Sequence, residues 1–312
     1  SSFASMFNLN KLMQDEGEPD DTMVIDISNI SIATLMNNFK PKEQASITIE
    51  MIRHLVLDTL RFNVVKFKGE YPEIVIAFDD RNYWRRQKAW YYKKRRQIEH
   101  EESESEWDWD RLNNFLNPVF EEIRQNMPYL GLKVEFAEAD DIIAVVTKKA
   151  VGEGRRVLVV SADSDFTQLQ KYNGVRQWSP PQKKWVTPKY GSPRNDLRYK
   201  NIKGDKKDSI ACIKIRNDYI VTKVEGERAP AVKSSELEAW LEADDPTTLM
   251  TPEWAARYKE NEELRDFEFI PKDIENSIIE AYNTPKSGSK AKMERYFMDN
   301  KLSRMFEKLS DF

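Results

Sequence analysis

Acidic side chains follow four apolar runs of this 312-residue chain, at the points where the runs end. The acids at these ends are Asp26, Asp79, Asp80, Glu138, Asp140, Asp141, Asp163 and Asp165. Clustered carboxylates repel one another, and a hard divalent cation such as Mg²⁺, which takes oxygen ligands, relieves that repulsion. Two such ions about 4 Å apart activate water and stabilise a leaving oxygen in phosphodiester cleavage. The pattern therefore predicts a metal-dependent hydrolytic site.

Each acid also has a simpler explanation. An acid after a strand is commonly a helix N-cap or a turn residue, and for any single one that explanation is favoured. Four loops that deliver acids together favour the metal site instead. Farther along, Asp205 and Asp208 lie three residues apart in the segment Gly204–Asp208, where they would face one way on a turn entering a helix. A capped helix start is the alternative there.

Residues 81–96 combine eight Lys or Arg with five aromatic side chains and contain no acid. If this segment is helical, Arg85, Tyr92, Lys93 and Arg96 share one face. Basic groups that face a polyanion, with aromatic rings that stack on bases, are typical of nucleic-acid binding. The segment begins directly after Asp79 and would stand over the acidic site. A solvated pair of helices with complementary charge is the alternative, because residues 99–110 hold seven acids.

The acids share one edge only if the apolar runs are parallel strands. The predicted strands are Met23–Ile25, Ile74–Phe78, Leu132–Phe136 and Val157–Val160, with a weaker one at Val175–Trp178. The helical patterns between them are Ile47–Val64, Phe115–Met127 and Ala139–Val151. Alternating strands and helices predict an α/β domain with a mostly parallel central sheet, in which all strand carboxyl ends meet at one edge.

Beyond residue 200 the pattern becomes helical. The predicted helices are Ser234–Glu242, Pro252–Glu263, Lys272–Tyr282 and Lys290–Phe306. We therefore expect an N-terminal tail over residues 1–21, an α/β domain over 22–200 with a basic helical arch near 81–110, and a smaller helical domain over 201–312.

The composition excludes several classes of protein. One cysteine rules out an intrachain disulfide, and two histidines leave carboxylates as the available metal ligands. No apolar run has the roughly 20 residues that span a bilayer, and the first residues do not resemble a signal peptide. The net charge of −4 conceals a basic remainder, because acids are concentrated in residues 1–21, in 99–110 and at the predicted site.

Five motifs together resemble the 5′-nuclease, or flap-endonuclease, superfamily. They are VIDIS (24–28), IAFDD (76–80), EADD (138–141), SADSDF (161–166) and GDKKD (204–208). The basic aromatic segment, with DFTQL (165–169), QWSP (177–180), KKWV (183–186) and KVEGER (223–228), narrows the resemblance to the ribonuclease H branch of T-even-type phages. The resemblance covers almost the whole chain from about residue 22.

The resemblance implies a PIN-like nuclease fold and two Mg²⁺ ions, with Mn²⁺ as a substitute. It implies that the first ion is surrounded by Asp26, Asp79, Glu138, Asp140 and Asp163. It implies that the second is supported by Asp165, Asp205 and Asp208, some through water, and Asp141 is a further candidate ligand. We count Asp26, Asp79, Glu138, Asp140, Asp163 and Asp165 as catalytic. The predicted nucleic-acid contacts are Arg85, Arg86, Tyr92, Lys93, Lys94, Arg96, Lys206, Lys207, Lys214 and Arg216.

The function implied is 5′→3′ exonuclease and flap-endonuclease activity on RNA–DNA hybrid and on nicked, forked or flapped duplex DNA. Its role would be the removal of RNA primers from lagging-strand fragments in the cytoplasm of an infected bacterium. The chain would be a monomer with no membrane contact. Its partners would be a sliding clamp, bound through Ser5-Met6-Phe7, and a single-stranded-DNA-binding protein, bound by the C-terminal domain. An ordinary chain end with no binding role explains Ser5-Met6-Phe7 at least as well as clamp binding does.

One segment departs from the superfamily pattern. Most members follow the last acid pair with a glycine-rich helix-hairpin-helix, whereas residues 209–216 here read SIACIKIR. A potassium site in that loop is therefore not expected, and Lys206, Lys207, Lys214 and Arg216 would hold phosphates by charge.

Two other functions stay open from the sequence. A phosphatase of the strand-end aspartate type needs a second acid two residues after the first, but Ser28 stands there. A non-catalytic nucleic-acid-binding scaffold accounts for residues 81–96 but leaves the clustered acids without a role.

Overall fold

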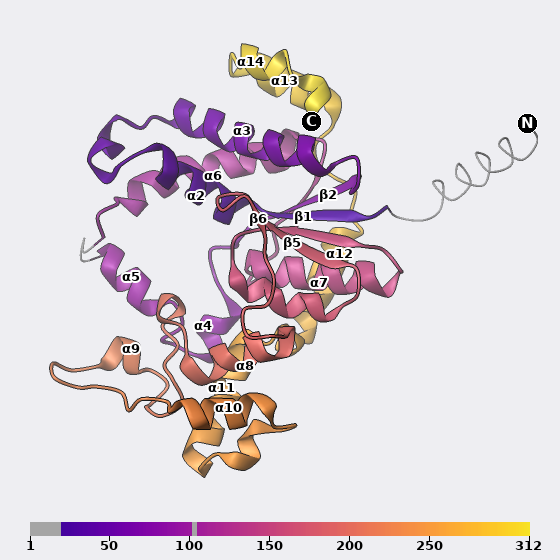
Figure 1. Cartoon of the computed structure of the whole chain (residues 1–312). Coiled ribbons are helices and arrows are strands. Elements are labelled where there is room, and N and C mark those ends of the chain that lie inside the picture. The colour runs from indigo at the N-terminus through magenta and orange to yellow at the C-terminus, as the bar shows by residue number, and fades with distance from the viewer. Residues whose placement is uncertain (1–19, 102–104) are drawn as a thin grey trace, which may run out of the picture.

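A six-stranded sheet forms the centre of the molecule, in a computed structural model that describes residues 20–101 and 105–312 (Figure 1). Its strands are β1 (Thr22–Asp26), β2 (Glu73–Ala77), β3 (Leu130–Leu132), β4 (Val157–Val160), β5 (Val175–Ser179) and β6 (Lys184–Trp185). They lie in the order β3-β2-β1-β4-β5-β6, and only β6 runs antiparallel to its neighbour. The predicted fold class, a mostly parallel sheet flanked by helices, is confirmed.

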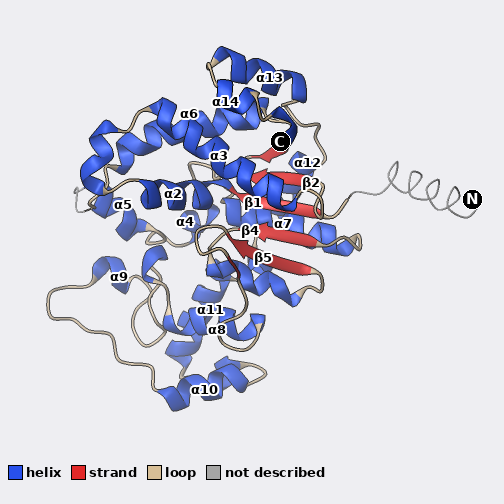
Figure 2. Cartoon of the chain, turned by 45° about the horizontal axis from the view of Figure 1, so that its top comes forward, coloured by secondary structure: helices blue, strands red, loops and turns tan. Residues whose placement is uncertain are grey.

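Helices cover both faces of the sheet (Figure 2). The α-helices are α2 (Ile27–Asn38), α3 (Ile49–Phe67), α4 (Trp84–Lys88), α5 (Lys94–Glu101), α6 (Trp109–Asn126), α7 (Ala139–Gly152), α8 (Pro193–Lys203), α9 (Tyr219–Thr222), α10 (Ser234–Glu242), α11 (Pro252–Arg265), α12 (Lys272–Tyr282), α13 (Lys290–Asp299) and α14 (Ser303–Phe306). The 3₁₀ turns are η1 (Pro41–Ser46), η2 (Ser164–Lys171), η3 (Lys206–Asp208), η4 (Pro246–Leu249), η5 (Phe267–Phe269) and η6 (Leu309–Asp311). None of the helices in the described residues is both long and apolar enough to cross a bilayer.

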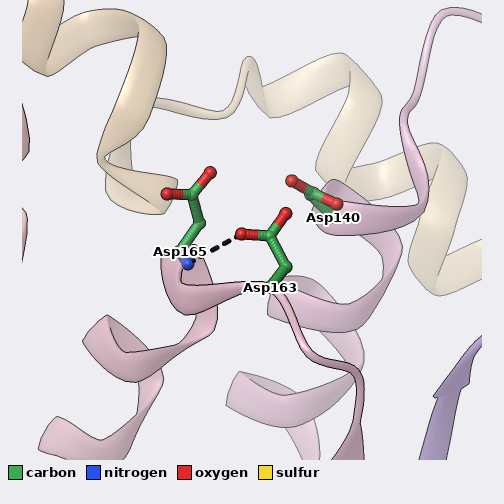
Figure 3. Close-up of side chains that lie close together, drawn as sticks. All are labelled: Asp140, Asp163 and Asp165. Atoms are coloured by element: carbon green, nitrogen blue, oxygen red, sulfur yellow. Dashed lines mark hydrogen bonds between the residues drawn. The ribbon is translucent and has the colours of Figure 1, made fainter. Parts of the chain in front are cut away.

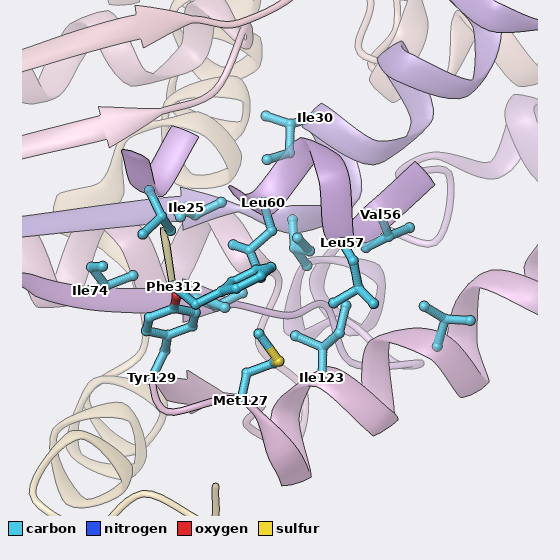
Figure 4. Packing of buried hydrophobic residues seen from close by; sticks show 14 of the residues in the cluster. Ile25, Ile30, Val56, Leu57, Leu60, Ile74, Ile123, Met127, Tyr129 and Phe312 are labelled. Carbon is cyan, nitrogen blue, oxygen red and sulfur yellow. The ribbon is translucent and has the colours of Figure 1, made fainter. Parts of the chain in front are cut away.

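The strands are apolar on both sides because each face packs on helices. In β1, Met23 and Ile25 point into the core under α2, α3 and α6, whereas Val24 points to the core under α7 and α12. Figure 4 shows the first of these cores, in which Leu57 of α3 and Ile123 of α6 pack beneath the sheet. Two-sided burial fixes the register of β1 and therefore the position of the acid at its end.

The chain beyond residue 200 packs in two places. Helices α10 and α11 join α8 around a small core that includes Trp240 and Tyr258. Helix α12 packs on α7, while α13 and α14 lie over α6 on the opposite face (Figure 1). The last residue, Phe312, is buried in the same core as α3. The end of the chain therefore stabilises the central sheet.

Three predicted elements are wrong in detail. The third strand is Leu130–Leu132, because residues 133–137 form a loop in which Phe136 has a φ of 63°. The helix predicted over 290–306 is interrupted, since Lys301 has a φ of 54° and the N–H of Leu302 donates to the carbonyl of Phe297 at 2.8 Å, a helix-ending geometry. The basic segment is also interrupted, by a turn over residues 89–93 between α4 and α5.

Candidate metal and nucleic-acid site

The carboxyl edge of the sheet collects the predicted acids. Asp26 ends β1 and caps α2, and Asp163 and Asp165 follow β4, the strand paired with β1. Asp140 lies in the first turn of α7, and Asp79 follows β2 and accepts a hydrogen bond from the N–H of Ala139 at 2.7 Å. β1 stands between β2 and β4, where the direction of strand succession reverses, and such a switch point is the usual ligand site of an open parallel sheet.

The first carboxylate group consists of Asp26, Asp79, Asp140 and Asp163. One carboxylate oxygen each of Asp140, Asp163 and Asp165 lie within 4.8 Å of one another, and Figure 3 shows these three side chains converging. Burial, together with the charges of Asp79 and Asp163, raises the pKa of Asp26 to about 7. Burial and the charges of Asp163 and Asp26 raise the pKa of Asp140 well above its usual value. The group is therefore short of positive charge.

The second carboxylate group consists of Asp165, Asp205 and Asp208, which also offer oxygens within 4.8 Å of one another. Gly204 allows the turn that presents it: its φ is 77°, and a Cβ there would lie 2.4 Å from the carbonyl oxygen of Ile210. Asp205 and Asp208 lie at the two ends of η3, and the side chain of Asp205 caps it. Asp205 is therefore both the cap of η3 and a member of the carboxylate cluster.

Two cations that the sequence analysis missed enter the second group. The guanidinium of Arg265 lies 3.0 Å from Asp165, 2.8 Å from Asp205 and 3.3 Å from Asp208. The ammonium of Lys200 pairs with Asp165 and donates to Ser164 Oγ at 2.7 Å. Burial alone would raise the pKa of Asp165, but Arg265 and Lys200 outweigh it and lower that pKa. No local motif surrounds Arg265, so the sequence alone contains no signal for it.

A buried ionic network lies behind the first group. Arg85 donates to Glu138 at 2.9 Å, to Asp141 at 2.7 Å and to the carbonyl oxygen of Leu264 at 2.7 Å. Trp84 Nε1 donates to the second oxygen of Asp141 at 3.1 Å, and the N–H of Glu138 donates there as well. This inner network, Trp84, Arg85, Glu138 and Asp141, is almost fully buried.

The inner network takes in residues predicted for the site. Asp141 accepts hydrogen bonds from Arg85, Trp84 and the N–H of Glu138, so its carboxylate faces the protein interior. The guanidinium of Arg85 is buried against two carboxylates and the carbonyl oxygen of Leu264, away from solvent. Burial would raise the pKa of Glu138, but Lys93 and Arg85 lower it to about 2. The charge of Glu138 is thus already compensated.

Part of the basic segment lines the mouth of the site. Lys93, with a φ of 55°, and the hydroxyl of Tyr92 both bond to Glu138. The side chain of Arg96 is 45% exposed, with its guanidinium 3.9 Å from Asp208. The side chain of Lys207 is 48% exposed, with its ammonium 3.4 Å from Asp163. Arg96 and Lys207 are therefore exposed cations beside the two groups, available to a polyanion.

The other predicted contacts differ in position. Arg86 donates to the carbonyl oxygen of Tyr92 at 2.7 Å and holds the turn, Lys94 lies 3.4 Å from Gln97, and Lys206 is exposed on η3. Lys214 is buried in an ion pair with Glu236, and Arg216 pairs with Glu227. The structure does not bring Lys214 and Arg216 to the carboxyl edge, because acids of the neighbouring loop and of α10 hold them.

Comparison with known proteins assigns the family. Residues 21–191 match the family described as the 5′-3′ exonuclease, N-terminal resolvase-like domain, and residues 191–312 match the family described as T4 RNase H, C terminal. The chain belongs to the 5′-3′ exonuclease family. It is 42% identical over 306 residues to Ribonuclease H of Enterobacteria phage T4. The match covers 97% of this chain and 99% of that protein. The chain is thus a nuclease of the T4 ribonuclease H branch, as the motifs predicted.

More distant similarities agree with the fold. Over 102 residues the chain is 32% identical to DNA polymerase I of Bacillus caldotenax, which covers 30% of this chain and 12% of that protein. The T5 D15 flap endonuclease, solved as a pseudo-enzyme-product complex with DNA and metal ions, superposes with a TM-score of 0.55 at 16% identity. T5 D15 protein co-crystallised with metal ions gives a TM-score of 0.52. Both matches cover 90% of this chain and 98% of the T5 protein.

Proposed function

We propose that this chain is a divalent-metal-dependent 5′→3′ exonuclease and flap endonuclease. Its substrates are RNA–DNA hybrid and nicked, forked or flapped duplex DNA, and it removes RNA primers from lagging-strand fragments during phage replication in the host cytoplasm. The observation that carries the proposal is the closeness of the two carboxylate groups, since Asp165 of the second group lies within 4.8 Å of Asp140 and Asp163 of the first, beside the exposed cations Arg96 and Lys207. The T4 relative's name and the T5 complex with DNA and metal ions support it.

The donor chemistry fits two hard divalent ions. Every candidate ligand is a carboxylate, and burial raises the pKa of Asp26 and Asp140, so the first group needs a cation to hold its full charge. Mg²⁺ suits such oxygen donors, and Mn²⁺ can replace it. When bound, a pair of such ions supplies Lewis-acid activation of water and neutralises phosphate charge.

The protein's own residues then have distinct tasks. In the proposal, the first group holds one ion and the second group holds the other. Arg96 and Lys207 attract the phosphodiester and orient it over the acids, while Lys93 orders the site through Glu138. The inner network fixes the start of α7, so that Asp140 keeps its direction.

One substitution tests the site directly. Asp163→Asn keeps the shape of the side chain but removes a charge, and we expect it to lower cleavage of a 5′-labelled nicked RNA–DNA hybrid with Mg²⁺ by on the order of 100-fold or more. The matched control is Asp299→Asn, an exposed acid at the end of α13, which should cleave like the unaltered chain. An Asp163→Asn protein of full activity would refute the site. If the unaltered chain binds duplex but cleaves no nicked, flapped or hybrid substrate, with Mg²⁺ as with EDTA, the scaffold alternative holds.

The proposal extends to organisation and partners. We propose a monomer with the nuclease unit over residues 22–200 and a helical DNA-binding unit over 201–312, which also contacts a single-stranded-DNA-binding protein. The clamp-binding segment Ser5-Met6-Phe7 lies outside the described residues. Deleting residues 1–19 should abolish capture by the sliding clamp, and unchanged capture would remove that segment from the proposal.

A further inference from the structure

The second carboxylate group contains positive charge of its own. Arg265 contacts all three of its acids, and Lys200 contacts Asp165. Three carboxylates with two cations leave a formal charge of −1. The first group has four carboxylates, and the ion pair found for it among the described residues joins Asp163 to the exposed Lys207. The two groups therefore offer an incoming divalent ion very different electrostatic attraction.

Arg265 cannot move aside easily. It ends α11, its side chain is 3% exposed, and its carbonyl oxygen accepts a hydrogen bond from Gln168 Nε2 at 2.9 Å. One turn earlier, Asn261 Nδ2 donates to the carbonyl oxygens of Asn201 and Ala211 at 2.9 and 3.0 Å, which joins α11 to the end of α8 and to the loop after η3. An arginine stays protonated in any protein environment, so this charge is permanent.

The group nevertheless keeps open capacity for a ligand. Asp208 is 5% exposed, and its Oδ1 atom has no hydrogen-bond partner among the described residues. A buried carboxylate oxygen without a partner is costly. The exposed guanidinium of Arg96 comes within 3.9 Å of this oxygen, too far for a hydrogen bond, so the oxygen stays open to a ligand beside Asp165 and Asp205.

We propose that Arg265, assisted by Lys200, is a fixed counter-cation that makes the second carboxylate group the weaker of two divalent-ion sites. This inference rests on the proposed metal dependence. The first group takes up an ion without substrate, because its four acids have one ion-pair partner in the described part of the chain, the exposed Lys207. The second reaches high occupancy only when a substrate phosphate adds negative charge beside Arg265. The fixed cation thereby couples completion of the site to the arrival of substrate.

Calorimetric titration of the full chain with Mg²⁺, without nucleic acid, tests this role. For Arg265→Gln we expect the second dissociation constant to fall by about 10- to 100-fold, the range for residues that surround metal ligands, while the first stays near its unaltered value. The control is Arg257→Gln, which removes the same charge from the same helix, where the guanidinium contacts the carbonyl oxygen of Ile213 instead of the acids. That control should leave both constants unchanged.

Two more variants keep the test decisive if Arg265→Gln fails to fold. Lys200→Met, at a side chain that is 19% exposed, should also tighten the second constant, and Arg265→Lys should retain the weak one because it keeps the charge. Two bound ions with an unchanged second constant in every folded neutral variant would overturn the role of Arg265 alone. An unaltered chain that binds no divalent ion would overturn the proposed metal dependence itself.

Discussion

Neighbouring acids of one motif are used in opposite ways. In the segment 138–141, Glu138 and Asp141 point inward to Arg85 and belong to the inner network, whereas Asp140 points to the first carboxylate group. The inner network compensates its charges with buried protein cations and backbone N–H groups. In the first group, the ion pair to a protein cation is that of Asp163 with the exposed Lys207. The same residue types therefore hold the protein together at one position and prepare for a ligand at the next.

The difference follows from where the helix begins. Glu138 is the N-cap of α7, and Asp141 sits at its third residue, so the two form a reciprocal capping pair. Asp140, one residue earlier on the helix, is rotated by about 100° from Asp141 and faces the strand ends. A single residue step within the first turn of α7 thus separates a structural face from a ligand-binding face.

The largest effect should come from breaking the inner network. Arg85→Gln leaves Glu138 and Asp141 buried without their main partner, and removing one member of a buried ion pair costs about 3–5 kcal/mol of folding free energy. Chemical denaturation of the unaltered chain and of the Arg85→Gln protein measures this loss of folding free energy. The comparison is Arg86→Gln, which should cost far less. It loses hydrogen bonds to Tyr92 and Gln97 but no ion pair to Glu138 or Asp141. Equal losses would mean that the network is not a special source of stability.

The sequence predicted the acids of the first group for a clear physical reason. Apolar runs that are buried on both faces identify parallel strands, and the ends of such strands meet, so Asp26 and Asp163 could be placed together. The third strand was misplaced because Val134 and Phe136 are apolar but pack against the second core from a loop. Periodicity cannot separate a buried loop from a short strand.

Contacts between side chains far apart in the sequence could not be predicted in the same way. Arg85 looked like a phosphate ligand because it lies in a basic run, yet its three partners come from α7 and the end of α11. Arg265 has no neighbouring motif, and only the packing of α11 brings it to the second group. Tertiary contacts decide whether a cation faces solvent or a carboxylate.

Neutralising an acid of the first carboxylate group should change folding stability in the opposite direction to a substitution in the inner network. Asp140→Asn removes a charge that burial and the neighbours Asp163 and Asp26 disfavour, so the metal-free protein should become more stable at neutral pH. The same change should reduce the rise in melting temperature that Mg²⁺ produces, because an ion stabilises only the state that binds it. Thermal melts with EDTA and with Mg²⁺ give both numbers. A destabilised metal-free Asp140→Asn protein would place Asp140 with the structural acids.

The smallest effect should come from the exposed cations beside the two carboxylate groups. Lys207→Gln removes a half-exposed cation beside Asp163, which should leave folding stability within about 0.5 kcal/mol. Binding to an uncleavable flapped duplex should weaken similarly for all sequences, and the slope of log affinity against log salt should become shallower by about one if Lys207 neutralises one phosphate. Fluorescence anisotropy over a salt series measures that slope, with Lys292→Gln on α13 as the distant exposed control. An unchanged slope would show that Lys207 serves Asp163 and not the nucleic acid, and it would then belong with Arg85 among the cations that compensate the protein's own acids.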